Sequence, residues 1–240
     1  MKIQKTIHWS HNTWVYVVSV ALAVAHITWA VSMLLEHSRY VYKLPNTEIF
    51  AALHVISALL LIAGRKTIGG GVSLTILFYY WLYVKPLEPI AEPQSVGLIF
   101  LSITIMTGKI TNRDISSVLL RLTLAYPFLE WGIDAFRNPG HFIAFMQSNY
   151  LTSVFIPSQY LLCAAFTLGV IEVTLAVLLV LGVAVRRVST AAAVVLLIFI
   201  IVAGYPLALP QNIPLIAAAY SLSILVTGRY TVQRIFNSFS

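Results

Sequence analysis

Two segments of the chain follow one pattern: ALHVISALLLIAG (52–64) and GVIEVTLAVLLVLG (169–182). Each carries one polar residue, His54 or Glu172, ten positions before its last glycine, and a basic pair follows closely. Each then leads through an apolar segment, a Pro-Gln pair and a last apolar segment that stops at Thr-Gly-Lys or Thr-Gly-Arg. Self-similarity at this distance predicts an internal duplication, which in a membrane protein sets the architecture.

The composition places the chain in a lipid bilayer. Of its 240 residues 59% are hydrophobic and only 10% are charged, which is too little polar material to cover a soluble globule. The formal charge of +7 would suggest nucleic acid as the partner of a soluble protein. Here the basic residues lie in short loops beside apolar segments, so we expect membrane lipid and no nucleic acid as partner.

Apolar runs predict an all-α, polytopic integral membrane protein with about eight transmembrane helices. Two parallel four-helix repeats, 1–112 and 113–240, would be related by an axis along the membrane normal, because four helices return the chain to the same side. The expected spans are 13–35, 48–64, 68–84, 94–108, 116–136, 159–183, 188–208 and 212–228.

The basic residues also predict the orientation in the cell membrane. With eight spans both termini lie on one side, where the loops carry ten of the lysines and arginines near the spans, against four on the other side. By the positive-inside rule both termini are expected in the cytoplasm. The ten are Lys2, Lys5, Arg65, Lys66, Lys109, Arg113, Arg186, Arg187, Arg229 and Arg234, and the four are Arg39, Lys43, Lys85 and Arg137.

The repeat predicts where buried polar groups lie. Gly64 and Gly182 are expected to end their helices, and ten residues of helix put His54 and Glu172 about 15 Å deeper, near the bilayer midplane. The first helices of the repeats align on Trp29 and Trp131. The second repeat carries an insertion near 139–157, which is expected to form an interfacial helix or a re-entrant segment.

The second repeat resembles the DoxX/DoxD family of four-helix membrane proteins over roughly residues 117–230. The resemblance rests on RLTLAYPFLEWG (121–132), 142–145, Ile156-Pro157, Gly169 to Glu172, Leu179 to Gly182 and Arg186-Arg187. Many members of the family have a lysine shortly after the glycine of the first helix, where this chain has Ala135. The first half looks like a degenerate copy, with His54 in the place of Glu172.

The resemblance implies a redox function. DoxD is known as the membrane subunit of a thiosulfate:quinone oxidoreductase, and other members look like accessory subunits of redox systems. The cofactor implied is therefore a quinone, and the partners implied are other membrane or peripheral redox subunits. Family resemblance does not by itself choose between these roles.

Buried charged residues indicate where such chemistry would take place. Charges at membrane depth are costly and usually face a bundle interior or a cavity. Glu172, Glu130 and Asp134 would form a ladder of carboxyl groups from the midplane outward, since the last two share a helix face. We predict Glu172, Glu130 and His54 as proton-handling catalytic residues. Arg121, Trp131, Asp134 and His26 are the residues expected around the head group.

Each residue also has a structural interpretation. Asp134 would be solvated or paired near Arg137, and Arg121 would reach the cytoplasmic interface. Glu130 and Glu172 would be protonated, hydrogen-bonded bundle residues. His26 and His54 would make hydrogen bonds between helices, because no spacing in the chain pairs them as ligands of one haem. Aromatic residues near the helix ends are typical of interfacial belts. They are Trp14, Tyr79, Tyr80, Trp81 and Tyr83.

Other chemistries find little support in the sequence. Cys163 is the single cysteine, so the chain has neither a disulfide framework nor a Cys-x-x-Cys motif. The glycines at 69–71 lack the lysine of a phosphate-binding loop. No metal or haem site is predicted. The alternatives to a quinone-linked redox subunit are a non-catalytic accessory or assembly subunit of a membrane respiratory complex and, with less support, a proton-coupled transporter.

Overall fold

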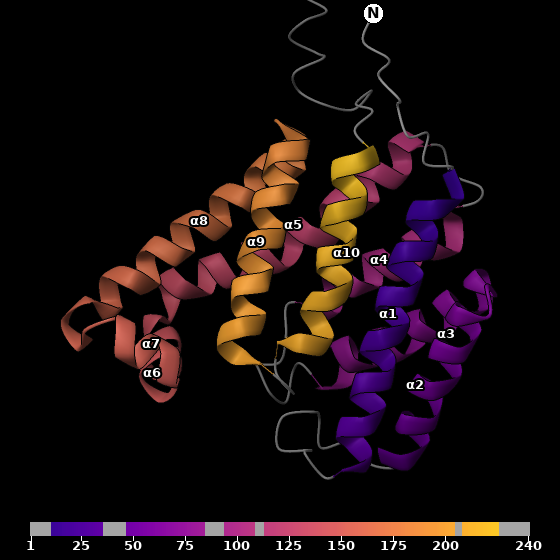
Figure 1. The fold of residues 1–240 in the computed structure, drawn as a ribbon, viewed down its shortest axis with the longest axis horizontal. Helices are drawn as coiled ribbons and strands as arrows, with labels where there is room; N and C mark the ends of the chain where they lie inside the picture. Colours follow the sequence, from indigo (N-terminus) through magenta and orange to yellow (C-terminus); the bar gives the residue numbers. More distant parts are fainter. Residues whose placement is uncertain (1–10, 36–46, 85–93, 109–112, 205–207, 226–240) are drawn as a thin grey trace, which may run out of the picture.

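The computed structural model describes residues 11–35, 47–84, 94–108, 113–204 and 208–225, and these residues are helical with short turns between the helices (Figure 1). Predictions that concern the termini, the Thr-Gly-Arg ending of the second repeat and several of the orienting basic residues lie outside this part of the chain. The helices of the first half are α1 (His11–Leu34), α2 (Thr47–Ile62), α3 (Lys66–Tyr79), the π-helix η1 (Tyr80–Val84) and α4 (Gln94–Thr107).

The second half has more elements than the first. Its helices are α5 (Arg113–Arg137), α6 (Pro139–Ser148), α7 (Tyr150–Phe155), the 3-10 helix η2 (Ser158–Tyr160), α8 (Leu161–Leu181), α9 (Val185–Ala203) and α10 (Leu209–Leu225). A helix covers most of each of the eight predicted spans. The insertion after α5 forms the two short helices α6 and α7, beside α8 in Figure 1.

Membrane-spanning length is clear for three of the described helical segments. Thr13–Leu34, Ser158–Leu181 and Val185–Ala203 are long and apolar enough to cross a bilayer. Three more, Thr47–Ile62, Ser95–Thr107 and Leu209–Leu225, are apolar but shorter. The protein is therefore an all-helical membrane protein over its described residues, whereas the number of eight crossings stays a prediction.

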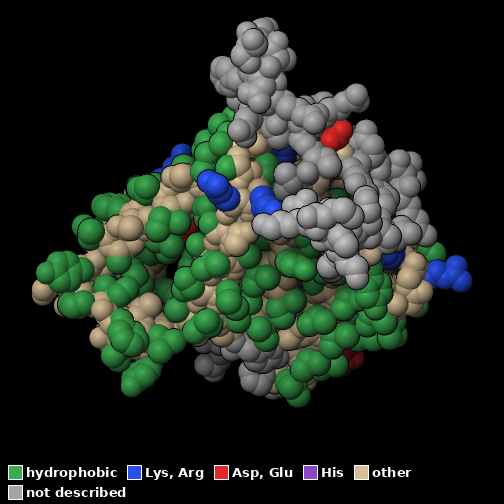
Figure 2. Space-filling model, turned by 45° about the horizontal axis from the view of Figure 1, so that its top comes forward, with side chains coloured by type: hydrophobic (Ala, Val, Ile, Leu, Met, Phe, Trp, Pro, Cys, Tyr) green, Lys and Arg blue, Asp and Glu red, His purple; other side chains and the backbone are tan. Residues whose placement is uncertain are grey.

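The surface agrees with a lipid environment. Figure 2 shows a face that is largely hydrophobic, with the Lys and Arg side chains toward its upper and right-hand margins. The lipid-facing character differs between helices: 61% of the apolar stretch of α1 is buried in the protein, against 33% for α8 and 28% for α9. Most of the apolar stretch of α8 and of α9 therefore lies on the outside of the bundle.

Corresponding helices pack in a corresponding order in the two halves. α1 packs along α2 and α3 along α4, as α5 packs along α8 and α9 along α10. The halves meet through α4 on α5 and through α10 on α1 (Figure 1). This order is what a duplicated bundle would give, although the duplication and its boundaries at residues 112 and 113 stay predictions.

α2 and α8 end in the same way. Gly64 and Gly182 have φ angles of +76° and +69°, the left-handed conformation that glycine adopts at low cost. In both turns the residue after the glycine donates its amide hydrogen to a carbonyl five residues earlier, Arg65 to Leu60 at 2.9 Å and Val183 to Leu178 at 3.0 Å. The prediction that these two glycines end their helices is confirmed.

The buried faces of α2 and α8 also share one register. In α2 the buried positions are Ala51, His54, Ser57, Ala58 and Leu61. Counting back from Gly182 instead of Gly64, the same positions in α8 are Gly169, Glu172, Leu175, Ala176 and Leu179, and all five are buried. His54 and Glu172 therefore occupy matching places, ten residues before the terminal glycine and on the face that enters the bundle.

Candidate functional site

Two histidines from different helices meet inside the first half. The Nδ1 atoms of His26 on α1 and His54 on α2 lie 2.6 Å apart, and both side chains are completely buried. α1 and α2 pack along each other, which brings together two residues that are 28 positions apart in the sequence. The prediction of hydrogen-bonded histidines between helices is confirmed.

The outer nitrogen of each ring is hydrogen-bonded as well. His54 Nε2 lies 2.9 Å from the hydroxyl of Tyr80, and His26 Nε2 lies 2.8 Å from Ser73 Oγ. Ser73 contacts Ser102 Oγ at 2.9 Å, and Ser102 lies 2.9 Å from the carbonyl oxygen of Leu98 on its own helix. A continuous chain of hydrogen bonds thus crosses α1, α2, α3 with η1, and α4. We call these five side chains the histidine chain.

Aromatic rings enclose the two histidines. The Trp29 ring lies edge-on to both, with centroids 5.7 Å from His26 and 5.5 Å from His54. The Tyr80 ring stacks on His54 at 5.8 Å, and Phe50 stacks on Tyr80 at 6.0 Å. Among the described residues no carboxylate, ammonium or guanidinium group forms a hydrogen bond or ion pair with either histidine. The pair therefore lies among neutral side chains in the interior of the bundle.

The assignment of Tyr80 and Trp14 to an interfacial aromatic belt is wrong. Tyr80 is only 2% and Trp14 only 3% exposed, because both rings turn into the bundle. Tyr80 is the first residue of the π-helix, whose wider turn continues α3. Trp81 is exposed, in keeping with the belt.

Glu172 is the corresponding group of the second half and has different surroundings. Its side chain is completely buried, and no described residue makes a hydrogen bond to either carboxyl oxygen. The neighbouring turns of α8 approach α5 closely: a Cβ atom added to Gly169 would lie 2.9 Å from the Cβ atom of Ala135 and 3.1 Å from the carbonyl oxygen of Gly132. Glu172 thus lies on the buried stripe of α8 one turn after the close contact with α5.

The predicted duplication pairs His26 with an apolar residue in the second half. With Trp29 aligned on Trp131, the counterpart of His26 is Phe128, an apolar ring that cannot form a hydrogen bond. Phe128 is buried, 3% exposed, in α5. Under the predicted duplication, the position of His26 thus carries no hydrogen-bonding group in the second half.

The other predicted residues lie along α5. Arg121 is largely buried, with 5% exposure, and its reach toward the cytoplasmic interface stays a prediction. Glu130 is half-buried, and Trp131 packs against Phe199 of α9 with ring centroids 5.4 Å apart. No described hydrogen bond joins Glu172 to Glu130, so their connection as a ladder stays a prediction.

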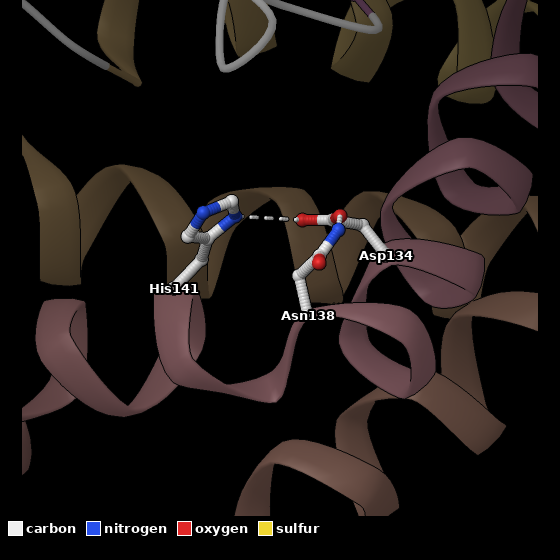
Figure 3. A network of polar contacts seen from close by, with 3 residues as sticks. All are labelled: Asp134, Asn138 and His141. Carbon is white, nitrogen blue, oxygen red and sulfur yellow. Dashed lines mark hydrogen bonds and ion pairs between the residues drawn. The ribbon is translucent and has the colours of Figure 1, made fainter.

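Asp134 lies at the end of α5 in a small polar cluster of its own (Figure 3). Asn138 donates a hydrogen bond to Asp134 Oδ1 at 2.7 Å, and His141 Nδ1 lies 3.4 Å from Asp134 Oδ2. The side chains of His141 and Asp134 are 53% and 37% exposed, respectively. This arrangement agrees with the solvated, paired interpretation of Asp134, with Asn138 and His141 as its recorded partners.

Comparison of the chain with known protein families gives one match. The DoxX family model matches residues 116–205, which run from the first turn of α5 to just beyond α9. The segment that contains Glu172 is thus DoxX-like, and the resemblance seen in the sequence is confirmed there, whereas the likeness to DoxD and the duplication stay predictions. No curated protein and no solved structure matches the chain. The histidine chain lies entirely outside the matched segment.

Proposed function

Starting from a chain that carries a DoxX-family membrane domain, we propose that it is the membrane subunit of a quinone-linked redox system. The observation that carries the proposal is Glu172, a fully buried carboxyl group with no hydrogen-bonding partner among the described residues. Burying such a group costs stability, and proteins usually keep one inside a membrane bundle where it binds a ligand or transfers a proton. Perturbed, buried titratable groups cluster at functional sites.

The chemistry of the carboxyl group fits a quinone. A bound quinone supplies two-electron chemistry coupled to two protons. The Glu172 carboxylate can accept a hydrogen bond and then a proton from a hydroxyl group of the reduced form, and in its protonated state it can donate to a carbonyl oxygen. Glu130 and Arg121 on α5 are the further residues that we propose for the surroundings of the head group, with Trp131 beside them.

His54 takes a smaller part in the proposed quinone site than Glu172. Both ring nitrogens of His54 are already hydrogen-bonded within the bundle, as are both nitrogens of His26. A head group would have to displace one of these internal bonds to reach either ring. Because its carboxyl oxygens have no such bonds among the described residues, Glu172 is the better candidate for proton transfer to or from a quinone.

The electrons must come from outside the described residues. We propose a partner redox subunit, or a substrate that reduces the quinone directly. The likeness to DoxD suggests thiosulfate as the first substrate to test: two thiosulfate ions give one tetrathionate ion and two electrons, and the quinone takes up these electrons with two protons.

Purification in mild detergent from native membranes tests the proposal. Mass spectrometry of co-purifying proteins and extracted lipids is expected to show stoichiometric quinone and a redox subunit. Glu172→Gln should lower the quinone content and lower quinone reduction about a hundredfold or more, while Thr174→Val, an exposed position two residues along α8, should change neither. A wild-type preparation without quinone would contradict the proposal, as would a Glu172→Gln variant with full turnover.

An accessory role is supported by a different observation. The apolar stretches of α8 and α9 are about two-thirds outside the protein core, and both lie in the DoxX-like segment. On α9, Ala191 is exposed and Ala193 half-buried, and small residues of this kind let another helix approach closely. Stable association with a large complex, without quinone at this chain and with Glu172→Gln fully assembled, would favour this role.

A further inference from the structure

The buried face of α9 loses its cover in the half of the helix that is farther from its turn with α8. The fully buried residues of α9 all lie between Val185 and Leu196. The next residues on the same helix face, Phe199, Ile200 and Ala203, are only half-buried. The face that packs into the bundle near the turn therefore continues along α9 without being fully covered.

α8 is divided in the same way. Its buried residues from Leu175 onward belong to the main hydrophobic core, together with those of α9. Leu161 and Ala165, at the other end of α8, form a separate cluster with Met146 of α6. Glu172 lies between the two clusters, one turn before Leu175. The far halves of α8 and α9 thus belong to different packing units.

A groove lies between these two half-helices, and we call it the lateral groove. Figure 2 shows a hollow between the lobe at its left, which carries α6 and α7 in Figure 1, and the centre of the molecule. Across it, the Trp131 ring of α5 lies 5.4 Å from the Phe199 ring of α9, centroid to centroid. Beyond this pair, Asn149 donates a hydrogen bond to the carbonyl oxygen of Val202 at 2.6 Å and bridges α7 to the end of α9.

Glu172 lies at the depth of the ring pair. Gly132 of α5 packs against α8 beside Glu172, since a Cβ atom added to it would lie 2.7 Å from Val173 Cγ2. Trp131 directly precedes Gly132, so its contact with Phe199 is at the level of Glu172. Because the Glu172 side chain is completely buried, a ligand in the lateral groove reaches the carboxyl group only when the two rings move apart.

The surroundings of the groove select the kind of ligand. The groove opens on a largely hydrophobic face, so it admits molecules that are dissolved in the bilayer (Figure 2). A buried carboxyl group beside its inner end favours a small uncharged head group that carries hydroxyl or carbonyl oxygens. The phosphate of a phospholipid is disfavoured, because a negative charge is costly at this depth and is repelled by a carboxylate. From Leu196 to Ala203 the groove is about 10 Å long, which suits one ring and the start of its tail.

We propose that the lateral groove is the entrance through which a quinone passes from the bilayer to Glu172, with Trp131 and Phe199 as its gate. This inference rests on the proposed function and deepens it, because it assigns the route and the residues that control it. The hydrogen bond between Asn149 and Val202 holds α7 across the far end of the groove. The quinone therefore enters sideways, between α8 and α9, and the reduced form leaves by the same route.

Photolabelling of the purified full chain in lipid vesicles tests the proposal. The probe is a long-tailed quinone with an azide on its ring, and a phospholipid with a diazirine on one acyl chain is the comparison. We expect the quinone probe to label 164–172 of α8 and 196–203 of α9, in competition with unlabelled long-tailed quinone. Equal labelling of these segments by the phospholipid probe, or saturable quinone labelling confined to other helices, would overturn the entrance but leave the proposed function intact. Absence of any saturable quinone labelling would overturn both.

A bulky side chain should block the groove. Ala203→Trp places a ring on the half-buried face of α9, and we expect it to lower quinone labelling about tenfold, as displacement of a few buried CH₂ groups would. Ile201→Trp is the control, because Ile201 is 62% exposed on the same turn of the helix. Thermal unfolding of both variants shows that they are folded. Equal labelling of Ala203→Trp and the wild type would contradict the entrance.

The gate is tested by removing one ring. Phe199→Ala takes away the contact with Trp131, and we expect the rate of quinone labelling at 164–172 to rise about tenfold, the equivalent of one lost aromatic contact. Phe166→Ala is the control, because it removes one ring of the Phe136 and Phe166 stack, which also joins two helices but lies on the exposed side of α8. An unchanged rate in Phe199→Ala, or a rise of the same size in Phe166→Ala, would show that the ring pair is not a gate.

Discussion

The two halves of the protein treat one buried polar position in opposite ways. His54 and Glu172 occupy the same place on α2 and α8, on matching buried stripes that end at glycines of the same conformation. His54 has a partner on each ring nitrogen, whereas Glu172 has none on either oxygen among the described residues. A satisfied polar group stabilises and specifies packing, while an unsatisfied one costs stability and is retained for another reason.

The difference extends to the helices around the two residues. In the first half α1, α2, α3 with η1, and α4 surround the histidine chain, and aromatic rings pack against the two histidines. In the second half α8 and α9 leave most of their apolar stretches outside the core. α2 of the first half has a similar outer face, with five of its 16 residues buried, so the halves differ in what surrounds the buried polar residue and not in how much apolar surface they expose.

The largest expected effect is at Glu172. Glu172→Gln should lower quinone-linked turnover about a hundredfold or more, the usual contribution of a proton-transferring group. Glu172→Leu should abolish turnover and at the same time raise the unfolding temperature, because it removes a buried carboxyl group that has no hydrogen-bonding partner. Turnover is measured as quinone reduction in membranes, and unfolding as thermal denaturation in detergent. A Glu172→Leu variant that is less stable than the wild type would show that the carboxyl group is structural.

In the histidine chain, by contrast, we expect replacement of a polar side chain by leucine to lower the stability of the protein. His26→Leu should destabilise the protein by about 1–3 kcal/mol, because His54 Nδ1 and Ser73 each lose a buried partner. His54→Leu should cost a similar amount. The double variant should cost less than the sum of the two, with a coupling of about 0.5–3 kcal/mol as found for residues in contact. Additive effects in denaturant unfolding would show that the contact between the rings contributes nothing to stability.

Most of the fold, but only part of the site, could be predicted from the sequence. Long apolar runs gave the positions of the eight helices, and the glycines before basic pairs gave two of their ends. The belt assignment of Tyr80 was wrong because an aromatic residue at a helix end is typical of an interface, and periodicity does not say which helix covers it. The split of the insertion into α6 and α7 was also missed.

The histidine chain shows what sequence reasoning lacked. His26 and His54 were identified singly, but their contact depends on how α1 and α2 pack, which no spacing in the chain records. Ser73 and Ser102 carried a usable signal, since each is a polar residue within an apolar helix and such residues usually find polar partners between helices. Glu172 was found from its place in the repeat, but its lack of partners required the structure.

Gly→Ala substitutions at close helix contacts should show a smaller difference in stability between the two halves. A Cβ atom at Gly132 would lie 2.7 Å from Val173 Cγ2, 2.9 Å from the Val173 nitrogen and 3.0 Å from the Gly169 carbonyl oxygen. Since two of these are backbone atoms, Gly132→Ala must push α5 and α8 apart, and it should cost about 1–3 kcal/mol. The comparison in the first half is Gly71→Ala on α3, whose added Cβ atom would have one neighbour within 4 Å, Met106 Cε at 3.9 Å, an ordinary van der Waals contact.

Gly71→Ala should therefore be neutral or stabilising by up to about 1 kcal/mol, because alanine has the higher helix propensity and its Cβ atom fits without displacing a neighbour. Thermal unfolding of the two variants side by side measures the difference. Equal losses would mean that the contact of α5 with α8 is no tighter than that of α3 with α4, and would remove the argument that Glu172 is held in place by close helix packing.

The smallest effect is expected at Asp134, which was predicted together with Glu172 but lies in the exposed cluster with Asn138 and His141 (Figure 3). Asp134→Asn keeps the size of the side chain and an oxygen that can accept from Asn138, so the free energy of unfolding should change by less than about 0.5 kcal/mol. Quinone-linked turnover should change less than twofold, because proton transfer at Glu172 does not require a second carboxyl group at the end of α5. Loss of turnover in Asp134→Asn as large as in Glu172→Gln would instead establish the ladder of carboxyl groups and extend the functional site from the core of the second half to the end of α5.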